Sequence, residues 1–161
     1  MENSEKRVLL VEDDRFLRRA CEASLRQRGL AVTTAADGEE GLRLARSELP
    51  DLILLDMLMP KLSGLEVLRA LRGEDATRAV PVLILSNSSR ESDIAEVTRL
   101  GISGYFVKSN LSLQELGELV DDERPELLLR DLQRQHYGVP PSNTSATFCA
   151  RPWSERFALT T

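Results

Sequence analysis

Residues 8–14 read VLLVEDD, four apolar residues that run directly into three consecutive carboxylates, Glu12, Asp13 and Asp14. A short run of Val and Leu is typical of a strand that is buried on both faces. Carboxylates packed at the end of such a strand raise one another's proton affinity and cost free energy unless a cation neutralises them. The stretch therefore predicts a buried strand that delivers acidic side chains to a cation-binding site.

Composition sets the class of protein. The chain has 161 residues, 42% of them hydrophobic and 29% charged, which is enough for one well-buried domain. The net charge is −5 and no basic stripe is present, so no direct nucleic-acid binding is expected. Because no apolar run approaches the roughly 20 residues that span a bilayer and no signal-peptide pattern occurs, we expect a cytoplasmic protein without a membrane segment.

Short apolar runs alternate with amphipathic segments along most of the chain. This alternation predicts a doubly wound α/β fold, with a five-stranded parallel sheet covered by helices, over residues 1–121. The predicted strands are Arg7–Val11, Ala31–Ala35, Leu52–Leu55, Val82–Leu85 and Gly104–Val107.

The predicted helices carry start and stop signals. Four pairs place a capping residue three positions before a Glu, and they are Asp37 with Glu40, Ser63 with Glu66, Ser88 with Glu91, and Ser112 with Glu115. Gly29 and Gly101 stand where helices are expected to end. The predicted apolar stripe of the first helix is Phe16, Leu17, Ala20, Cys21, Ala23, Ser24 and Leu25. Cys21 and Cys149 match neither a metal-ligand spacing nor a disulfide framework, so Cys21 is expected to pack within the fold.

Polar residues follow the predicted strands at the edge where such sheets bind ligands. Asp56 follows the third strand, Ser86 the fourth and Lys108 the fifth. Carboxylates with room for water suit Mg²⁺, a hard ion that prefers oxygen ligands. Since an Asp carboxylate can carry a phosphoryl group as a covalent intermediate, the set predicts magnesium-dependent phosphoryl chemistry. Each residue alone has a simpler interpretation, and Asp13 or Asp14 could cap the first helix.

Together these motifs resemble the receiver domain of two-component response regulators, over about residues 5–121. The resemblance rests on spacing: 43 residues separate Asp13 from Asp56, 30 separate Asp56 from Ser86, and 22 separate Ser86 from Lys108. It implies a (βα)5 flavodoxin-like fold. It also implies that Asp56 accepts a phosphoryl group from a sensor histidine kinase or a histidine phosphotransferase.

The resemblance also assigns roles to the other residues of the set. The implied Mg²⁺ ligands are Asp13, Glu12 mainly through water, Asp56, and the backbone carbonyl of Leu58. Lys108 and Ser86 would contact the phosphoryl oxygens. Ser86 and Tyr105 would form the switch, with Tyr105 rotating inward as Ser86 moves. The output surface would be formed by the fourth helix, the fifth strand and the fifth helix, which would contact a downstream protein.

Several positions depart from the family pattern. Ser109 replaces the proline that commonly follows the lysine, and because a cis bond before serine costs roughly 3 to 4 kcal/mol, we expect a trans bond or local strain. Asn87 stands where a small residue is frequent and would narrow access to Asp56. Leu58 and Ser88 flank the acceptor with neither an acid nor an amide to orient water, which predicts a long-lived phosphorylated state.

The last 40 residues, 122–161, are expected to form a C-terminal extension. A short amphipathic helix after Pro125 is predicted, followed by an irregular or disordered tail. The segment is too short and not basic enough for a DNA-binding output domain, so we expect a stand-alone receiver that acts through protein contact. The apolar side of this helix, formed by Leu127, Leu128, Leu129 and Leu132, would either support a homodimer or pack on its own domain.

Two other classes of function remain for comparison. A phosphatase of the haloacid dehalogenase type also uses an Asp nucleophile with Mg²⁺, but Leu58 occupies the place of its second Asp. A pseudo-receiver would keep the fold as a binding module that is never phosphorylated. Leu58 argues against the phosphatase, and the intact Glu12, Asp13, Asp56, Ser86 and Lys108 argue against the pseudo-receiver. We therefore expect a phosphoacceptor signalling protein, not an enzyme, with at most slow autodephosphorylation.

Overall fold

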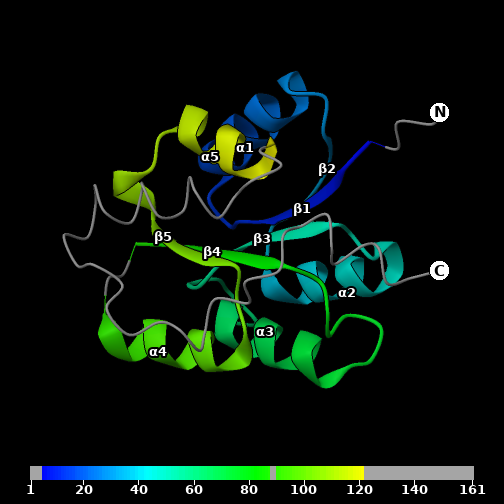
Figure 1. The fold of residues 1–161 in the computed structure, drawn as a ribbon, viewed down its shortest axis with the longest axis vertical. Helices are drawn as coiled ribbons and strands as arrows, with labels where there is room; N and C mark the ends of the chain where they lie inside the picture. The colour runs from blue at the N-terminus through cyan, green and yellow to red at the C-terminus, as the bar shows by residue number, and fades with distance from the viewer. Residues whose placement is uncertain (1–4, 88–89, 122–161) are drawn as a thin grey trace.

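The computed structural model describes residues 5–87 and 90–121, which form one parallel sheet between two layers of helices (Figure 1). The strand order is β2-β1-β3-β4-β5. The strands are β1 (Arg7–Val11), β2 (Ala31–Ala35), β3 (Leu52–Asp56), β4 (Val82–Ser86) and β5 (Gly104–Val107). The helices are α1 (Arg15–Gln27), α2 (Gly38–Glu48), α3 (Gly64–Gly73), α4 (Glu91–Leu100), the 3₁₀ turn η1 (Lys108–Asn110) and α5 (Leu113–Asp121). The predicted doubly wound fold is confirmed.

The sheet is buried on both faces because successive side chains of a strand point to opposite sides. In β1, Val8 and Leu10 join the core beneath α1 and α5, whereas Leu9 and Val11 join the core beneath α2, α3 and α4. Figure 1 shows these two helical layers above and below the strands. β2 lies on one side of β1, and β3, β4 and β5 follow on the other side, so the strand order reverses at β1.

Two strands extend one residue further than predicted. Asp56 lies within β3, beside Leu85 of β4, and Ser86 lies within β4, beside Val107 of β5. Both polar residues are therefore held in the sheet rather than in the loops that follow. Rigid backbone at these positions fixes the directions of both side chains.

The helix signals are mostly confirmed. Capping boxes form at Ser63 with Glu66 and at Ser112 with Glu115, and the Asp37 side chain accepts from the Glu40 backbone N–H. The predicted start at Ser88 is wrong, because α4 begins at Glu91 and its N-cap, Arg90, makes no side-chain cap bond; Ser88 itself lies outside the described residues. The predicted ends are correct, with Gly29 and Gly101 at φ of 83° and 92°.

The prediction for Phe16 is wrong. Its side chain is 86% exposed, whereas Cys21 and Leu25 of the same helix are buried. The buried line follows the i, i+4 spacing of Leu17, Cys21 and Leu25, and Phe16 is one residue away from that line, a rotation of about 100°.

Three further predictions concern the Lys108–Ser109 bond, membrane helices and the C-terminal extension. The described residues contain no cis peptide bond, so the bond between Lys108 and Ser109 is trans, as predicted. No helix within the described part of the chain is long and apolar enough to cross a membrane. The predicted extension, with Pro125 and its leucines, lies outside the described residues.

An acidic pocket at the carboxyl edge of the sheet

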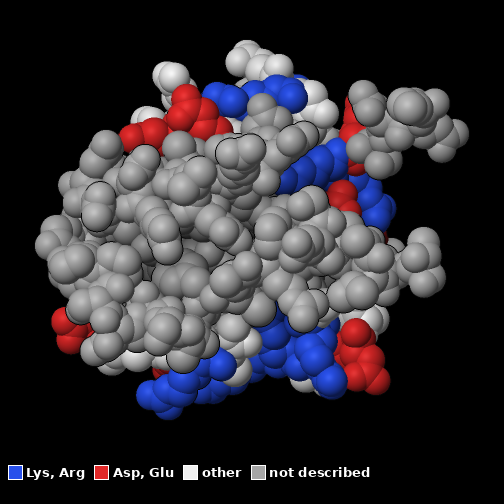
Figure 2. Space-filling model, in the orientation of Figure 1, with Lys and Arg blue, Asp and Glu red and all other residues white. Residues whose placement is uncertain are grey.

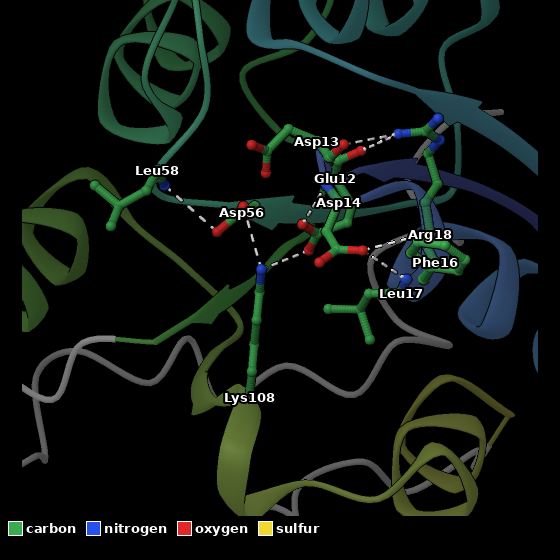
Figure 3. A network of polar contacts seen from close by, with 9 residues as sticks. All are labelled: Glu12, Asp13, Asp14, Phe16, Leu17, Arg18, Asp56, Leu58 and Lys108. Atoms are coloured by element: carbon green, nitrogen blue, oxygen red, sulfur yellow. Dashed lines mark hydrogen bonds and ion pairs between the residues drawn. The ribbon is translucent and has the colours of Figure 1, made fainter.

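Three acidic side chains and one lysine meet where β1, β3 and β5 end (Figure 3). Carboxylate oxygens of Glu12, Asp13 and Asp56 all lie within 4.8 Å of one another. Glu12 and Asp56 are buried, with 1% and 4% of their surface exposed, while Asp13 is exposed. The sequence predicted this convergence, since parallel strands deliver their carboxyl ends to one edge.

Lys108 is shared between the two buried carboxylates. Its Nζ lies 2.6 Å from Glu12 Oε2 and 3.2 Å from Asp56 Oδ2. One ammonium therefore faces two carboxylates, and the negative charge of Asp13 is added at the mouth of the site. Because the protein interior screens charges poorly, this uneven count leaves the site short of positive charge.

Burial and uneven charge both affect the pKa values of the site. Burial, and next the charge of Glu12, raise the pKa of Asp56, Lys108 lowers it, and the net result is a pKa of about 7. Burial would lower the pKa of Lys108, but its hydrogen bond to Glu12 and the charges of both carboxylates outweigh burial and raise this pKa. Lys108 is thus a fixed cation, and a second cation beside Asp56 would favour its ionised form.

The loop between β1 and α1 is held by its own polar groups. The Glu12 N–H donates to the Ala35 carbonyl at 3.1 Å, and the Asp14 N–H donates to Glu12 Oε1 at 3.1 Å. Asp14 caps α1, since its carboxylate accepts from the backbone N–H groups of Phe16 and Leu17. The capping alternative is therefore correct for Asp14, and Glu12 and Asp13 are left to the pocket.

The loop after β3 comes close to the acceptor carboxylate. The Leu58 N–H lies 3.4 Å from Asp56 Oδ1, and the Leu58 side chain is 70% exposed beside it. Gly64 allows α3 to begin here, because a Cβ at this position would lie 2.2 Å from the Asp56 carbonyl oxygen. The pocket at this edge of the sheet has a volume of about 500 Å³. Its lining residues are Glu12, Asp13, Asp14, Leu17, Asp56, Leu58, Asn87, Lys108 and Ser109.

Ser86 and Tyr105 lie next to the pocket rather than in its lining. Both are buried, Ser86 completely and Tyr105 with 6% exposed. Burial raises the pKa of Tyr105, a hydrogen bond with the Ser86 side chain lowers it, and the charges of Asp93 and Asp56 raise it. Tyr105 therefore lies close to Ser86, and the charges of Asp93 in α4 and of Asp56 both affect its pKa.

Cys21 is buried on α1, as its packing role predicted. Burial raises the pKa of its thiol to about 11, and Glu12 contributes to the rise. A thiol held protonated in this way is a poor nucleophile and a poor metal ligand.

Two basic residues near this edge, Lys61 and Arg18, carry no signal in the sequence. Lys61 has a positive φ of 68° and forms ion pairs with Asp37 and Glu39 at the start of α2. The Arg18 guanidinium donates to backbone carbonyls of the loop after β1. The contacts of both residues depend on the conformation of a loop. Hydrophobic pattern and capping signals do not predict that conformation.

The donor set fits Mg²⁺. Three carboxylates gather within reach of one ion, two of them buried with a single lysine between them, and the pocket leaves room for water. Mg²⁺ prefers oxygen ligands and keeps part of its hydration shell. A divalent cation would also oppose the effects of burial and of Glu12, which raise the pKa of Asp56.

Known proteins share this sequence pattern. A family model described as "Response regulator receiver domain" matches residues 8–121. The transcriptional activator protein PfeR of Pseudomonas aeruginosa is 45% identical over 125 residues, which cover 77% of this chain and 38% of PfeR. The transcriptional regulatory protein AfsQ1 of Streptomyces coelicolor is 41% identical over 101 residues, 63% of this chain and 44% of AfsQ1. The chain thus spans less than half the length of these two regulators.

Solved structures share the fold. The receiver domain of sensor histidine kinase PA1611 from Pseudomonas aeruginosa, which has a magnesium ion in its active site cleft, is 31% identical with a TM-score of 0.66, over 72% of this chain and 95% of that chain. The phosphorylated cyanobacterial phytochrome response regulator RcpA is 34% identical with a TM-score of 0.63, over 73% and 90%. From its sequence, its sheet order and its acidic edge, the chain belongs to the response regulator receiver domain family of two-component signalling.

Proposed function

We propose that this chain is a phosphorylation-controlled response regulator in which Asp56 accepts a phosphoryl group from a sensor histidine kinase or a histidine phosphotransferase. The observation that carries the proposal is the sharing of Lys108 between Glu12 and Asp56, with Asp13 beside them. A site that is short of positive charge favours the arrival of a cation. Of the acids, Asp56 is the one that lies in a strand, with its carboxylate directed into the pocket.

In the proposed reaction, an Asp56 carboxylate oxygen attacks phosphorus, and the phosphorus–nitrogen bond of a phosphohistidine breaks. The imidazole, which carries a proton on its other ring nitrogen, takes the electron pair of that bond and leaves as neutral histidine. Mg²⁺ held by Glu12, Asp13, Asp56 and the Leu58 carbonyl would neutralise the reacting oxygens. Lys108 exchanges part of its contact with the carboxylates for a phosphoryl oxygen. The chain thus takes part in its own modification without turning over an external substrate.

The output follows from the neighbours of Asp56. A phosphoryl group adds negative charge and strong acceptor oxygens, so the Ser86 hydroxyl gains a competing partner. Because Ser86 is hydrogen-bonded to Tyr105, a change at Ser86 alters the position of Tyr105. We propose that this change biases the surface of α4, β5 and α5 between two arrangements and that a downstream protein, or a second copy of the chain, binds one of them.

Slow loss of the phosphoryl group is also proposed. The side chain at position 58 is an exposed leucine, which offers no group to orient an attacking water. We expect Leu58→Asn to shorten the lifetime of the phosphorylated protein in a decay followed by intact mass. Equal lifetimes for the variant and the parent would contradict this part of the proposal.

The experiment that tests the function is intact-protein mass spectrometry after incubation with acetyl phosphate and Mg²⁺. We expect one phosphoryl adduct on the wild type and none on Asp56→Asn or in the presence of a chelator. Asp51→Asn is a matched control, because Asp51 precedes the same strand and accepts a hydrogen bond from the Arg7 N–H far from the pocket. It should be modified like the wild type. Absence of the adduct from the wild type would contradict the proposal and favour a pseudo-receiver.

A further inference from the structure

Arg18 connects the first turn of α1 to the acidic loop that precedes it. Its Nη1 donates to the Glu12 carbonyl at 2.8 Å and to the Asp13 carbonyl at 3.2 Å (Figure 3). The backbone of the same residue donates to the Asp14 carbonyl at 2.9 Å. Side chain and backbone of Arg18 therefore bind three successive carbonyls of the loop, residues 12–14.

The bond to Asp13 fixes the orientation of one particular peptide unit. In a trans peptide the C=O and N–H point in opposite directions. The carbonyl of Asp13 faces the Arg18 guanidinium, and the N–H of the same unit, which belongs to Asp14, donates to Glu12 Oε1 at 3.1 Å. This peptide is thus held at one end by a guanidinium and at the other by a carboxylate of the pocket.

The orientation of this peptide determines where the Glu12 carboxylate lies. One carboxylate oxygen of Glu12 is held by the Asp14 N–H and the other by Lys108. A rotation of the peptide about its neighbouring bonds would turn the Asp14 N–H away from Glu12 Oε1 and release that oxygen. Hydrogen bonds from a charged donor are stronger than neutral ones, so Arg18 resists that rotation.

We propose that Arg18 is a positioning residue for Mg²⁺ binding, one that acts through the Asp13–Asp14 peptide and not through contact with the ion. This inference rests on the proposed function, since it assumes that the acidic pocket holds Mg²⁺. A residue that only stabilised the fold would lower the stability of the protein and leave the Mg²⁺ affinity of the folded fraction unchanged.

The test is the Mg²⁺ dissociation constant of the full chain, measured by isothermal titration calorimetry for the wild type, Arg18→Ala, Arg18→Lys and Arg19→Ala. Arg19 is the matched control, because it is exposed on the same helix and makes no hydrogen bond or ion pair with the described residues. We expect Arg18→Ala to weaken Mg²⁺ binding about tenfold, as losses of residues that orient metal ligands do. Arg19→Ala should bind like the wild type.

Arg18→Lys separates charge from geometry. A lysine keeps the charge but lacks the planar fork of donors, so its affinity should lie between those of the wild type and Arg18→Ala. Circular dichroism identifies any variant that is not folded, and if Arg18→Ala fails to fold, the comparison of Arg18→Lys with the wild type decides. Wild-type affinity in the folded Arg18 variants would overturn this inference alone. Absence of Mg²⁺ binding by the wild type would overturn the proposed function together with it.

Discussion

Glu74 and Asp56 are both carboxylates that face a cation, yet their proton affinities change in opposite directions. Glu74, at the end of α3, accepts from Arg46 Nε at 2.9 and 3.0 Å on the surface, and its hydrogen bond to Arg46 lowers its pKa. Asp56 shares Lys108 with Glu12 in a buried pocket, and its pKa is raised to about 7. The difference has two causes: Asp56 is buried whereas Glu74 lies on the surface, and Asp56 shares its cation with a second carboxylate, Glu12.

Most ion pairs on the surface of the described residues join one basic side chain to one acidic side chain. Arg69 pairs with Glu96 and Arg78 with Asp75, whereas Lys61 pairs with both Asp37 and Glu39. Figure 2 shows basic and acidic side chains close together at the upper and lower edges of the molecule. Water screens such pairs, so they contribute little individually to stability. The acidic pocket differs because its charges are buried and unequal in number.

The largest effect is expected from removal of the shared lysine. Lys108→Ala would leave the buried carboxylates Glu12 and Asp56 without their cation, which should lower the free energy of unfolding in chelator by about 3 kcal/mol. Urea denaturation measures this loss, and added Mg²⁺ should recover part of it. Lys61→Ala, which removes a lysine from an exposed ion pair, is the matched control and should lose much less. Equal losses of unfolding free energy in Lys108→Ala and Lys61→Ala would show that the buried lysine stabilises the protein no more than the exposed one.

Asp56→Asn should have the opposite effect. The folded-state pKa of Asp56, about 7, lies above its ordinary value of 3.8, so the folded protein holds the proton more tightly than the unfolded chain. The stabilisation that this proton gives is present at low pH and is lost as the pH rises from about 4 to 7. In chelator at about pH 8, Asp56→Asn should therefore be more stable than the wild type by about 2 kcal/mol.

The pH dependence makes this prediction specific. The advantage of Asp56→Asn should shrink towards about pH 5, where the wild-type carboxyl is protonated, when unfolding in urea is compared at the two pH values. Asp75→Asn provides the control, because Asp75 is an exposed carboxylate paired with Arg78. A loss of stability in Asp56→Asn at about pH 8 would mean that Lys108 alone compensates the negative charge of the carboxylates in the pocket.

The smallest effect is expected at the surface pair. Arg46→Ala removes the contact between α2 and Glu74, and water can replace it, so urea denaturation should detect only a small loss. The loss should decrease further at high salt, since exposed charges are screened. If Arg46→Ala lost as much unfolding free energy as Lys108→Ala, the exposed and the buried ion pairs would be equally stabilising, which would contradict the comparison.

The sequence predicted the fold and the acidic edge well, because both depend on local patterns. Apolar runs define the strands, and a polar residue at the end of each run defines the edge at which Asp56 and Lys108 meet, with Ser86 beside the pocket. The boundaries were less accurate. The predicted third and fourth strands ended before Asp56 and Ser86, because a polar residue at the end of an apolar run resembles the start of a loop.

The remaining features depend on tertiary geometry. The exposure of Phe16 follows from the rotation of α1 about its axis, which depends on packing against α5 and the sheet. The hydrogen bonds of Arg18 depend on the path of residues 12–14, and the sharing of Lys108 depends on how closely the carboxyl ends of β1, β3 and β5 approach one another. Hydrophobic pattern and capping signals do not specify these distances.

The central claim is that the carboxyl edge of the sheet holds more negative charge than Lys108 can balance. The most direct test is the pKa of the Asp56 carboxyl, measured by carbon-13 NMR in chelator and again with saturating Mg²⁺. We expect a value of about 7 in chelator and a marked fall when Mg²⁺ is added. Titration near the ordinary value of 3.8 in chelator, with no change on adding Mg²⁺, would contradict the claim.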